Sequence, residues 1–102
     1  MTGRPAMRLR YSQGVQDALR TFPPKVRRDL RAALELIAED PRHPDLDLKA
    51  LRKVAPFPFF RARVRQYRII YSVHPGFVYV WRTQHRSEGY DWLDRMDPWR
   101  EG

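Results

Sequence analysis

The sequence contains no cysteine among its 102 residues. This absence excludes disulfide bonds, thiol nucleophiles and thiolate metal sites, and it is compatible with a reducing cytoplasm. The sequence also lacks an apolar run as long as a signal peptide or a membrane-spanning helix requires. We therefore expect a cytoplasmic protein with no membrane partner.

Carboxylates are absent from a long internal segment. Residues 48–87 contain nine lysines and arginines but no aspartate or glutamate, although the whole chain has 12 acidic residues and a formal net charge of +8. A stretch of one charge sign is typical of a surface for an anionic partner, such as nucleic acid phosphate or an acidic protein segment. The alternative is a solvated basic face without a partner.

Motifs for metals and nucleotides are missing as well. His43, His74 and His85 are far apart, and no acidic cluster, glycine-rich phosphate loop or G-x-S-x-G sequence accompanies them. We therefore expect no metal and no cofactor. An enzyme built from this chain would have to transfer protons and stabilise charge with histidine, tyrosine and arginine.

The apolar pattern of the first half predicts a strand followed by two helices. Met7, Leu9 and Tyr11 alternate with arginines, as in a half-buried strand, and Ser12 is placed to cap a short helix. A second, amphipathic helix is predicted from about Pro24 to Asp40, followed by a loop over residues 41–47.

The second half predicts three strands, at residues 60–65, 67–73 and 77–83, with a turn or extended link at 48–54 and a short helix at 90–96. The order β-α-α-β-β-β indicates an α+β fold in one domain over residues 1–102. We expect an antiparallel sheet covered on one face by an αα-hairpin.

An alternating row of arginines is the strongest local signal for binding. Arg61, Arg63 and Arg65 are expected on one side of a strand, about 6.5–7 Å apart. Successive phosphates of a nucleic acid strand have a similar spacing, and Arg68 on the next strand could complete the patch. An exposed sheet face kept soluble by arginine is the alternative.

The stretch HRSEGY, from His85 to Tyr90, follows the last predicted strand. His85 has a suitable pKa range for a general acid or base, and Tyr90 could orient or stack on a nucleotide. With arginines to stabilise a phosphorane, this set suits metal-free RNA cleavage by 2′-OH attack. In the structural alternative, His85 ends a strand and Tyr90 packs a helix. Phe77 and Tyr79 are expected in the core, and Trp81 either there or on a base-stacking surface.

The sequence also resembles a known family. LKAL at 48–51, FRARVRQYRIIYSV at 60–73 and FVYVWRTQHRSEGY at 77–90 occur in this order. The ordered set resembles the RelE/ParE superfamily of toxin–antitoxin toxins over about residues 7–93, leaving an extra acidic tail at 94–102. The resemblance implies a RelE-like fold and a small basic toxin held inactive by a cognate antitoxin.

In the RelE-like branch, the toxin enters the ribosomal A site and cleaves mRNA. The resemblance implies that the functional positions of this branch fall on six residues: Arg61, Arg63, Arg68, His85, Arg86 and Tyr90. In this arrangement, HRSEGY would form one wall of a site and would face the strand that carries the arginines. Further contacts to nucleic acid are expected from Arg52, Lys53, Arg65 and Arg82. Gln84 departs from the family pattern, because RelE has an arginine at this place, and the departure shifts catalytic weight to His85.

Two alternatives stay open at this point. ParE-like members poison DNA gyrase and are not nucleases, and the closing His-Arg-x-x-Tyr pattern occurs in both branches. An inert member would act only as a co-repressor bound to its antitoxin. The expected partners are accordingly the antitoxin, the ribosome with its mRNA, and operator DNA only through the antitoxin complex.

Overall fold

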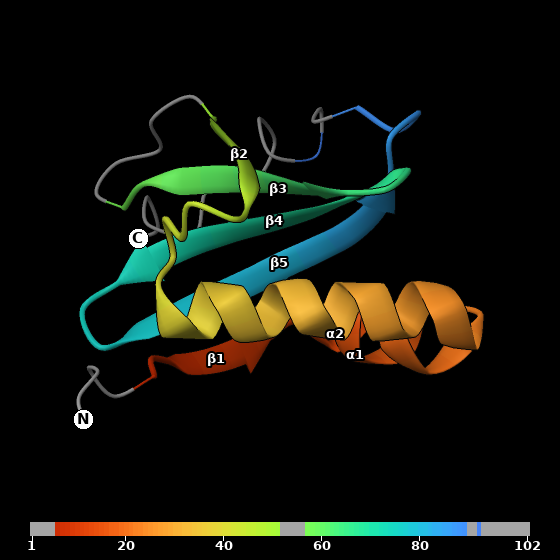
Figure 1. The fold of residues 1–102 in the computed structure, drawn as a ribbon, viewed down its shortest axis with the longest axis horizontal. Helices are drawn as coiled ribbons and strands as arrows, with labels where there is room; N and C mark the ends of the chain where they lie inside the picture. The colour runs from red at the N-terminus through yellow and green to blue at the C-terminus, as the bar shows by residue number, and fades with distance from the viewer. Residues whose placement is uncertain (1–5, 52–56, 90–91, 93–102) are drawn as a thin grey trace.

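The computed structural model describes residues 6–51, 57–89 and 92. It contains seven elements in the order β1 (Arg8–Tyr11), α1 (Gln13–Thr21), α2 (Pro24–Glu39), β2 (Asp47–Ala50), β3 (Phe59–Val64), β4 (Tyr67–His74) and β5 (Phe77–His85), as Figure 1 shows. Neither helix in these ranges has the length and hydropathy needed to cross a membrane.

The strands form one five-stranded sheet in the order β1-β5-β4-β3-β2. The predicted α+β fold, with two helices between the first strand and the later ones, is confirmed. Two details differ from the prediction. First, β1 runs parallel to β5, so the sheet is mixed and not antiparallel. Second, residues 47–50 form the edge strand β2. The sequence pattern does not predict this strand, because only one of its four side chains is half-buried.

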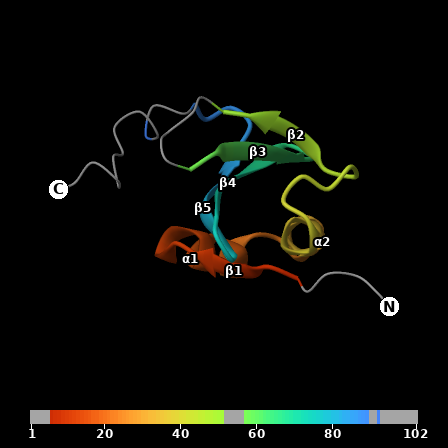
Figure 2. The same ribbon diagram turned by 90° about the vertical axis from the view of Figure 1, so that its left-hand side faces the viewer.

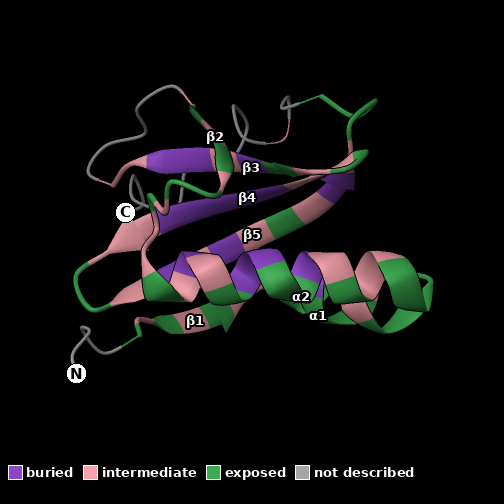
Figure 3. Cartoon of the chain, in the orientation of Figure 1, coloured by how far each residue is buried: buried purple, intermediate pink, exposed green. Residues whose placement is uncertain are grey.

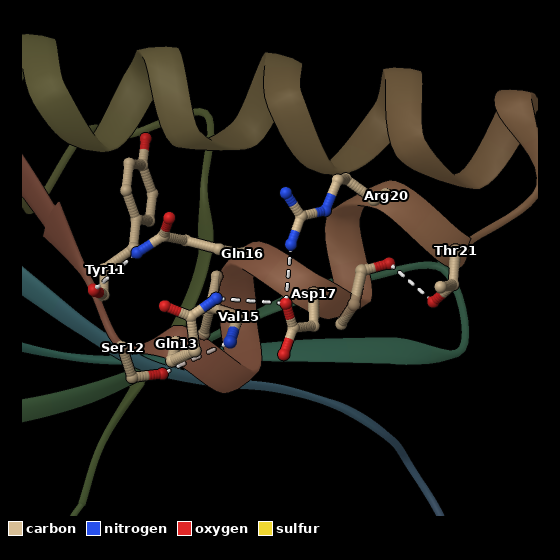
Figure 4. A network of polar contacts seen from close by, with 9 residues as sticks. Tyr11, Ser12, Gln13, Val15, Gln16, Asp17, Arg20 and Thr21 are labelled. Carbon is tan, nitrogen blue, oxygen red and sulfur yellow. Dashed lines mark hydrogen bonds and ion pairs between the residues drawn. The ribbon is translucent and has the colours of Figure 1, made fainter.

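Ser12 joins the start of α1 to the sheet. Its hydroxyl accepts a hydrogen bond from the Val15 backbone N–H at 3.2 Å and donates one to the Trp81 carbonyl of β5 at 2.9 Å. Figure 4 shows this cap together with Asp17, which accepts hydrogen bonds from Gln13 and Arg20 on the helix surface. The predicted cap is therefore confirmed, and it also fixes where α1 begins relative to β5.

The core lies between α2 and one face of the sheet. Helix α2 buries a stripe of apolar side chains, coloured purple in Figure 3: Leu30, Ala33, Leu34 and Ile37. The sheet contributes Phe60, Ala62, Ile69, Tyr71, Val78 and Val80 to the same cluster. The Tyr71 hydroxyl donates to the Pro41 carbonyl at 2.5 Å, which ties the loop after α2 to the core, and burial raises the pKa of Tyr71.

The two faces of the sheet differ because side chains alternate along each strand. We call the face that packs against α2 the inner face; Figure 2 shows α2 on that side. The opposite side is the outer face. At strand positions it carries Phe59, Arg61 and Arg63 of β3, Arg68, Ile70 and Ser72 of β4, and their partners on neighbouring strands.

The β4–β5 hairpin carries an aromatic stack at the end of the sheet. Its turn uses Gly76 at φ 83°, a left-handed conformation that favours glycine. The His74 ring lies between Phe57, at 4.0 Å, and Phe77, at 4.6 Å between ring centroids. The Ser72 hydroxyl accepts from the Trp81 indole N–H at 2.8 Å and forms a second hydrogen bond with Nε2 of His74 at 2.6 Å. Burial lowers the pKa of His74.

We predict that Ser12→Ala lowers the free energy of unfolding by about 1–2 kcal/mol, because it removes both the helix cap and the bond to β5. Thr21→Ala is the matched control, since its exposed hydroxyl only bonds back to Ala18 of the same helix. Urea unfolding followed by circular dichroism measures both. Equal losses in the two variants would contradict the anchoring role of Ser12.

We also predict a loss of stability in mild acid that depends on His74. Its pKa in the folded state lies below the unfolded value of 6.5. The unfolded chain therefore binds the proton first, so stability is present above that value and is lost as the pH falls through the folded pKa. Between about pH 7.5 and about pH 5, the urea midpoint should fall further in the wild type than in His74→Gln. Parallel curves for the two proteins would refute this assignment.

Candidate functional site

The strand register gathers four arginines on the outer face. Arg63 of β3 is the direct partner of Arg68 on β4, and Ile70 lies between Arg61 on β3 and Arg82 on β5. Direct partners on neighbouring strands have Cβ atoms about 4.5–5.5 Å apart. We call Arg61, Arg63, Arg68 and Arg82 the arginine cluster. Such a density of guanidinium groups is suited to bidentate contacts with phosphate.

Two members of the cluster have distinct surroundings. Nε and Nη1 of Arg61 are buried, and no hydrogen-bond partner for them occurs in the described part of the chain. A buried donor without a partner is costly, so a movement of this side chain that brought the two nitrogens to an anion would be favoured. Arg63 instead pairs with Asp47 of β2, with 2.9 Å between Nε and Oδ2, and both side chains are about half exposed.

Arg65 does not extend this cluster. Strand β3 ends at Val64, and Arg65 enters the turn to β4 with φ 58°. Its guanidinium forms an ion pair with Asp29 of α2, on the inner side of the sheet. The predicted row of three arginines on one side is therefore wrong at its third member, because the strand ends one residue earlier than the alternation indicates.

His85 lies on the inner side of the sheet. It is the strand partner of Tyr67, and the two rings meet edge to face at 5.5 Å. Tyr67 itself packs on Phe22 at 5.0 Å. In the imidazole, Nδ1 accepts the Ser87 backbone N–H at 3.2 Å, and Nε2 lies 3.4 Å from Oε1 of Gln66. The expected position, facing the arginines, is therefore wrong, and the catalytic role of His85 stays a prediction.

Gln84 lies on the outer face beside Arg68 and is only 2% exposed. Its Nε2 donates to the carbonyls of Glu88 and Gly89, both at 3.1 Å, and its Oε1 accepts from the Trp92 indole N–H at 2.9 Å. The sequence marked this position only as a departure from a family pattern. In the structure, the amide anchors the segment after β5 to the arginine cluster.

Trp92 covers part of the outer face as a result. Its ring packs against the small cluster of Phe59 and Ile70. The Arg82 guanidinium lies over the indole, 4.5 Å from the ring centroid, in a cation–π contact. One side of the arginine cluster is therefore apolar, which lowers the local dielectric and strengthens any ion pair formed there.

The outer face also carries an aromatic row, His74, Phe77, Tyr79 and Trp81, on the half nearer the β4–β5 hairpin. The prediction that Phe77 and Tyr79 belong to the core is wrong, since both are half-exposed and lie away from α2. The register shift between Ile70 and Tyr71 leaves Trp81 without a strand partner, and its ring meets Tyr79 at 4.4 Å. Such a bulge redirects side chains, and the sequence pattern does not reveal it.

The remaining predicted positions divide into two groups. Arg86 is exposed just after β5, where its backbone N–H donates to the Gln66 carbonyl at 2.7 Å. Arg52, Lys53 and Tyr90 lie outside the described residues. Within the ranges described, no three histidine, aspartate or glutamate side chains come together as a metal site.

Comparison with solved structures identifies the fold as a known one. A chain of the archaeal RelE–RelB complex from Pyrococcus horikoshii OT3 superposes with a TM-score of 0.71 at 22% identity, covering 82% of this chain and 99% of that chain. A chain of the RelB–RelE antitoxin–toxin complex from Methanococcus jannaschii gives 0.64 at 21% identity, with coverages of 82% and 98%. The isolated E. coli RelE toxin gives 0.63 at 21% identity, with coverages of 88% and 95%.

Sequence comparison assigns the family. No match was found among curated proteins. Residues 9–90 match the family described as the ParE toxin of type II toxin–antitoxin system, parDE. This match spans both helices and the five strands except the first residue of β1, and it includes the arginine cluster and the closing motif. The chain therefore belongs to the ParE toxin family of type II toxin–antitoxin systems, within the RelE/ParE superfamily.

Proposed function

We propose that this toxin is a RelE-like endoribonuclease that cleaves mRNA on the translating ribosome. The observation that carries the proposal is the arginine cluster, four guanidinium side chains that the strand register gathers on the outer face. The strand positions of β3, β4 and β5 on the outer face bear no carboxylate. A phosphodiester is the anion that such a surface suits.

The proposed reaction needs no cofactor. The 2′-OH gives up its proton as its oxygen attacks the adjacent phosphate, the bond to the 5′-oxygen breaks, and that oxygen takes up a proton, so the products are a 2′,3′-cyclic phosphate and a 5′-OH end. Negative charge builds on the phosphorane between these events. Guanidinium groups positioned beforehand stabilise that charge without reorganisation, and this effect is commonly the largest single contribution to catalysis.

The residues have unequal roles in this proposal. Arg61, Arg63 and Arg68 bind the scissile phosphate, and Asp47 holds Arg63 until the phosphate replaces it. Arg82 is kept beside them by Trp92. Arg86, which is exposed just after β5, adds a further positive charge, and Tyr90 keeps the role that the family resemblance implies for it. His85 faces the inner side, so we expect it to contribute through the position of this motif more than through direct proton transfer.

The proposed partners follow from the same surface. The chain is a toxin of a toxin–antitoxin family, and two of the similar structures are complexes of RelE with RelB. We propose that a cognate antitoxin inhibits this toxin by shielding the basic outer face. The ribosome, its mRNA and a cytoplasmic location belong to the same proposal.

Inhibition of DNA gyrase is the second candidate function. The matching family is described by ParE, the toxin of parDE, and this favours the ParE branch. The separation of His85 from the arginine cluster favours it as well, because a gyrase inhibitor needs no proton-transfer group beside its arginines. Co-repression through the antitoxin is compatible with either activity.

We predict that the double variant Arg61→Ala, Arg63→Ala cleaves translated mRNA more slowly by roughly tenfold to a thousandfold, since phosphorane stabilisation is lost. Arg65→Ala is the control: it removes an arginine just after β3, but that arginine pairs with Asp29 on the other side of the sheet. Primer extension on a message translated in a cell-free system locates and quantifies the cuts.

The same assay separates the two candidate functions. Intact messages together with arrested gyrase and DNA breaks would refute the nuclease and establish the ParE-like activity. Equal cleavage by the double variant and the wild type would show that the arginine cluster is not the site. If Arg65→Ala lost as much cleavage activity as the double variant, the loss in both would be attributed to impaired folding.

A further inference from the structure

We propose that the aromatic row and the two arginines of β1 form a second binding site, which takes unpaired bases of single-stranded RNA next to the arginine cluster. This inference rests on the proposed function, because it extends the path of the same substrate. It assigns a role to Arg8, Arg10, Phe77, Tyr79 and Trp81, which the cleavage chemistry does not use.

The parallel pairing of β1 with β5 builds this site. Arg8 is the strand partner of Phe77, and Arg10 is the partner of Tyr79. Met7, Leu9 and Tyr11 pack against the core, so the arginines between them lie on the outer face. The Arg10 guanidinium lies 5.5 Å from the centroid of the Phe77 ring. Each arginine of β1 therefore lies beside an aromatic side chain of β5.

The site is open to a ligand. Arg8 and Arg10 are exposed, and Phe77, Tyr79 and Trp81 keep part of their surface accessible. Beside them, a hollow of about 370 Å³ is lined by Ala6, Arg8, Arg10, Pro75, Gly76 and Phe77. Partly exposed aromatic rings in a row form a continuous apolar patch, and such patches mark binding surfaces.

The aromatic rings are held in place from below. The Trp81 indole N–H donates to Ser72, and the Ser72 hydroxyl in turn bonds His74. The Phe59 ring stacks on Trp81 at 6.0 Å with an interplanar angle of 23°. Fixed rings lose little side-chain entropy when a base stacks on them, which makes them effective platforms.

Charge selects the occupant. Along the outer-face positions of β1, β5, β4 and β3 there is no carboxylate, and Asp47 at the β2 edge already pairs with Arg63. A polyanion is therefore favoured over a neutral peptide. Among polyanions, single-stranded RNA uses both features, since its bases stack on aromatic rings and its phosphates pair with arginine.

Strand β5 connects this site to the arginine cluster. From Phe77 to Gln84 the strand rises roughly 23 Å, which is the length of a few nucleotides. The bulge brings Trp81 onto the outer face next to Arg82. A strand of RNA bound along β5 would therefore pass from the aromatic row to the arginine cluster without leaving the outer face.

The test measures binding separately from cleavage. Fluorescence anisotropy of the full-length toxin is recorded with a 2′-O-methyl RNA oligomer of about eight nucleotides, which lacks the attacking hydroxyl. Tyr79→Ala should weaken binding roughly 5- to 100-fold, as loss of one stacked base predicts. Tyr79→Phe should bind as the wild type does, because it keeps the ring. Thermal unfolding checks that both variants are folded.

Charge and base stacking are then tested one at a time. Arg10→Ala should weaken binding, whereas Arg28→Ala, which removes an exposed arginine from α2, should not. An abasic oligomer should bind wild type and Tyr79→Ala equally, because neither can stack on it. Equal affinity of wild type and Tyr79→Ala for the normal oligomer would overturn the proposal.

Two further outcomes are distinguishable. If the messages stay uncut in the primer-extension assay but Tyr79→Ala still loses oligomer binding, the nuclease proposal fails and the binding site stands. If Tyr79→Ala loses only the binding of an acidic peptide and keeps that of RNA, the row belongs to a protein partner and the proposal is overturned.

Discussion

The packing of α2 against β3, β4 and β5 fixes the direction of every side chain on the sheet. Leu30 and Ile37 of the helix are fully buried, and so are Ile69, Tyr71, Val78 and Val80 on the strands. A slip of one residue in any of these strands would bring polar side chains into this core, so the register is strongly specified. Because strand side chains alternate, the same packing forces the arginines between these positions onto the outer face.

The outer face is therefore a consequence of the core as much as of its own residues. Its composition divides along β5: aromatic side chains lie near the hairpin and arginines near the β3–β4 turn. Buried apolar neighbours such as Ile70 and Phe59 lie beneath and between them. Basic groups on such a support are less solvated than on a helix surface, which strengthens their contacts with anions.

Neighbouring residues of the closing motif show how strongly alternation governs this site. Gln84 and His85 are adjacent in sequence, yet one is buried beside Arg68 and the other meets Tyr67 on the inner side. The residue just before the closing motif and the first residue in it therefore point to opposite faces, so closeness in the sequence does not describe a compact site. The solved RelE-type structures share the fold at 21–22% identity, so this fold tolerates wide change in sequence.

Much of the fold was determined by local patterns. The alternation of Met7 to Tyr11, the Ser12 cap, the apolar stripe of α2 and the His74–Gly76 turn each reflect interactions within a few residues, and the structure confirms them. The absence of carboxylates from residues 48–87 likewise predicted a basic surface, because the net charge of a segment follows from its composition and does not depend on tertiary contacts. Strand β2 escaped prediction because an exposed edge strand has no apolar alternation.

Tertiary structure alone decided which residues share the site. The end of β3 at Val64 sent Arg65 to Asp29, and the bulge beside Ile70 put Trp81 and Arg82 on the outer face. The parallel pairing of β1 with β5 brought Arg8 and Arg10 to the aromatic row from nearly seventy positions away in the sequence. Each of these depends on where strands end and how they pair, and such long-range contacts leave no periodic trace in the sequence.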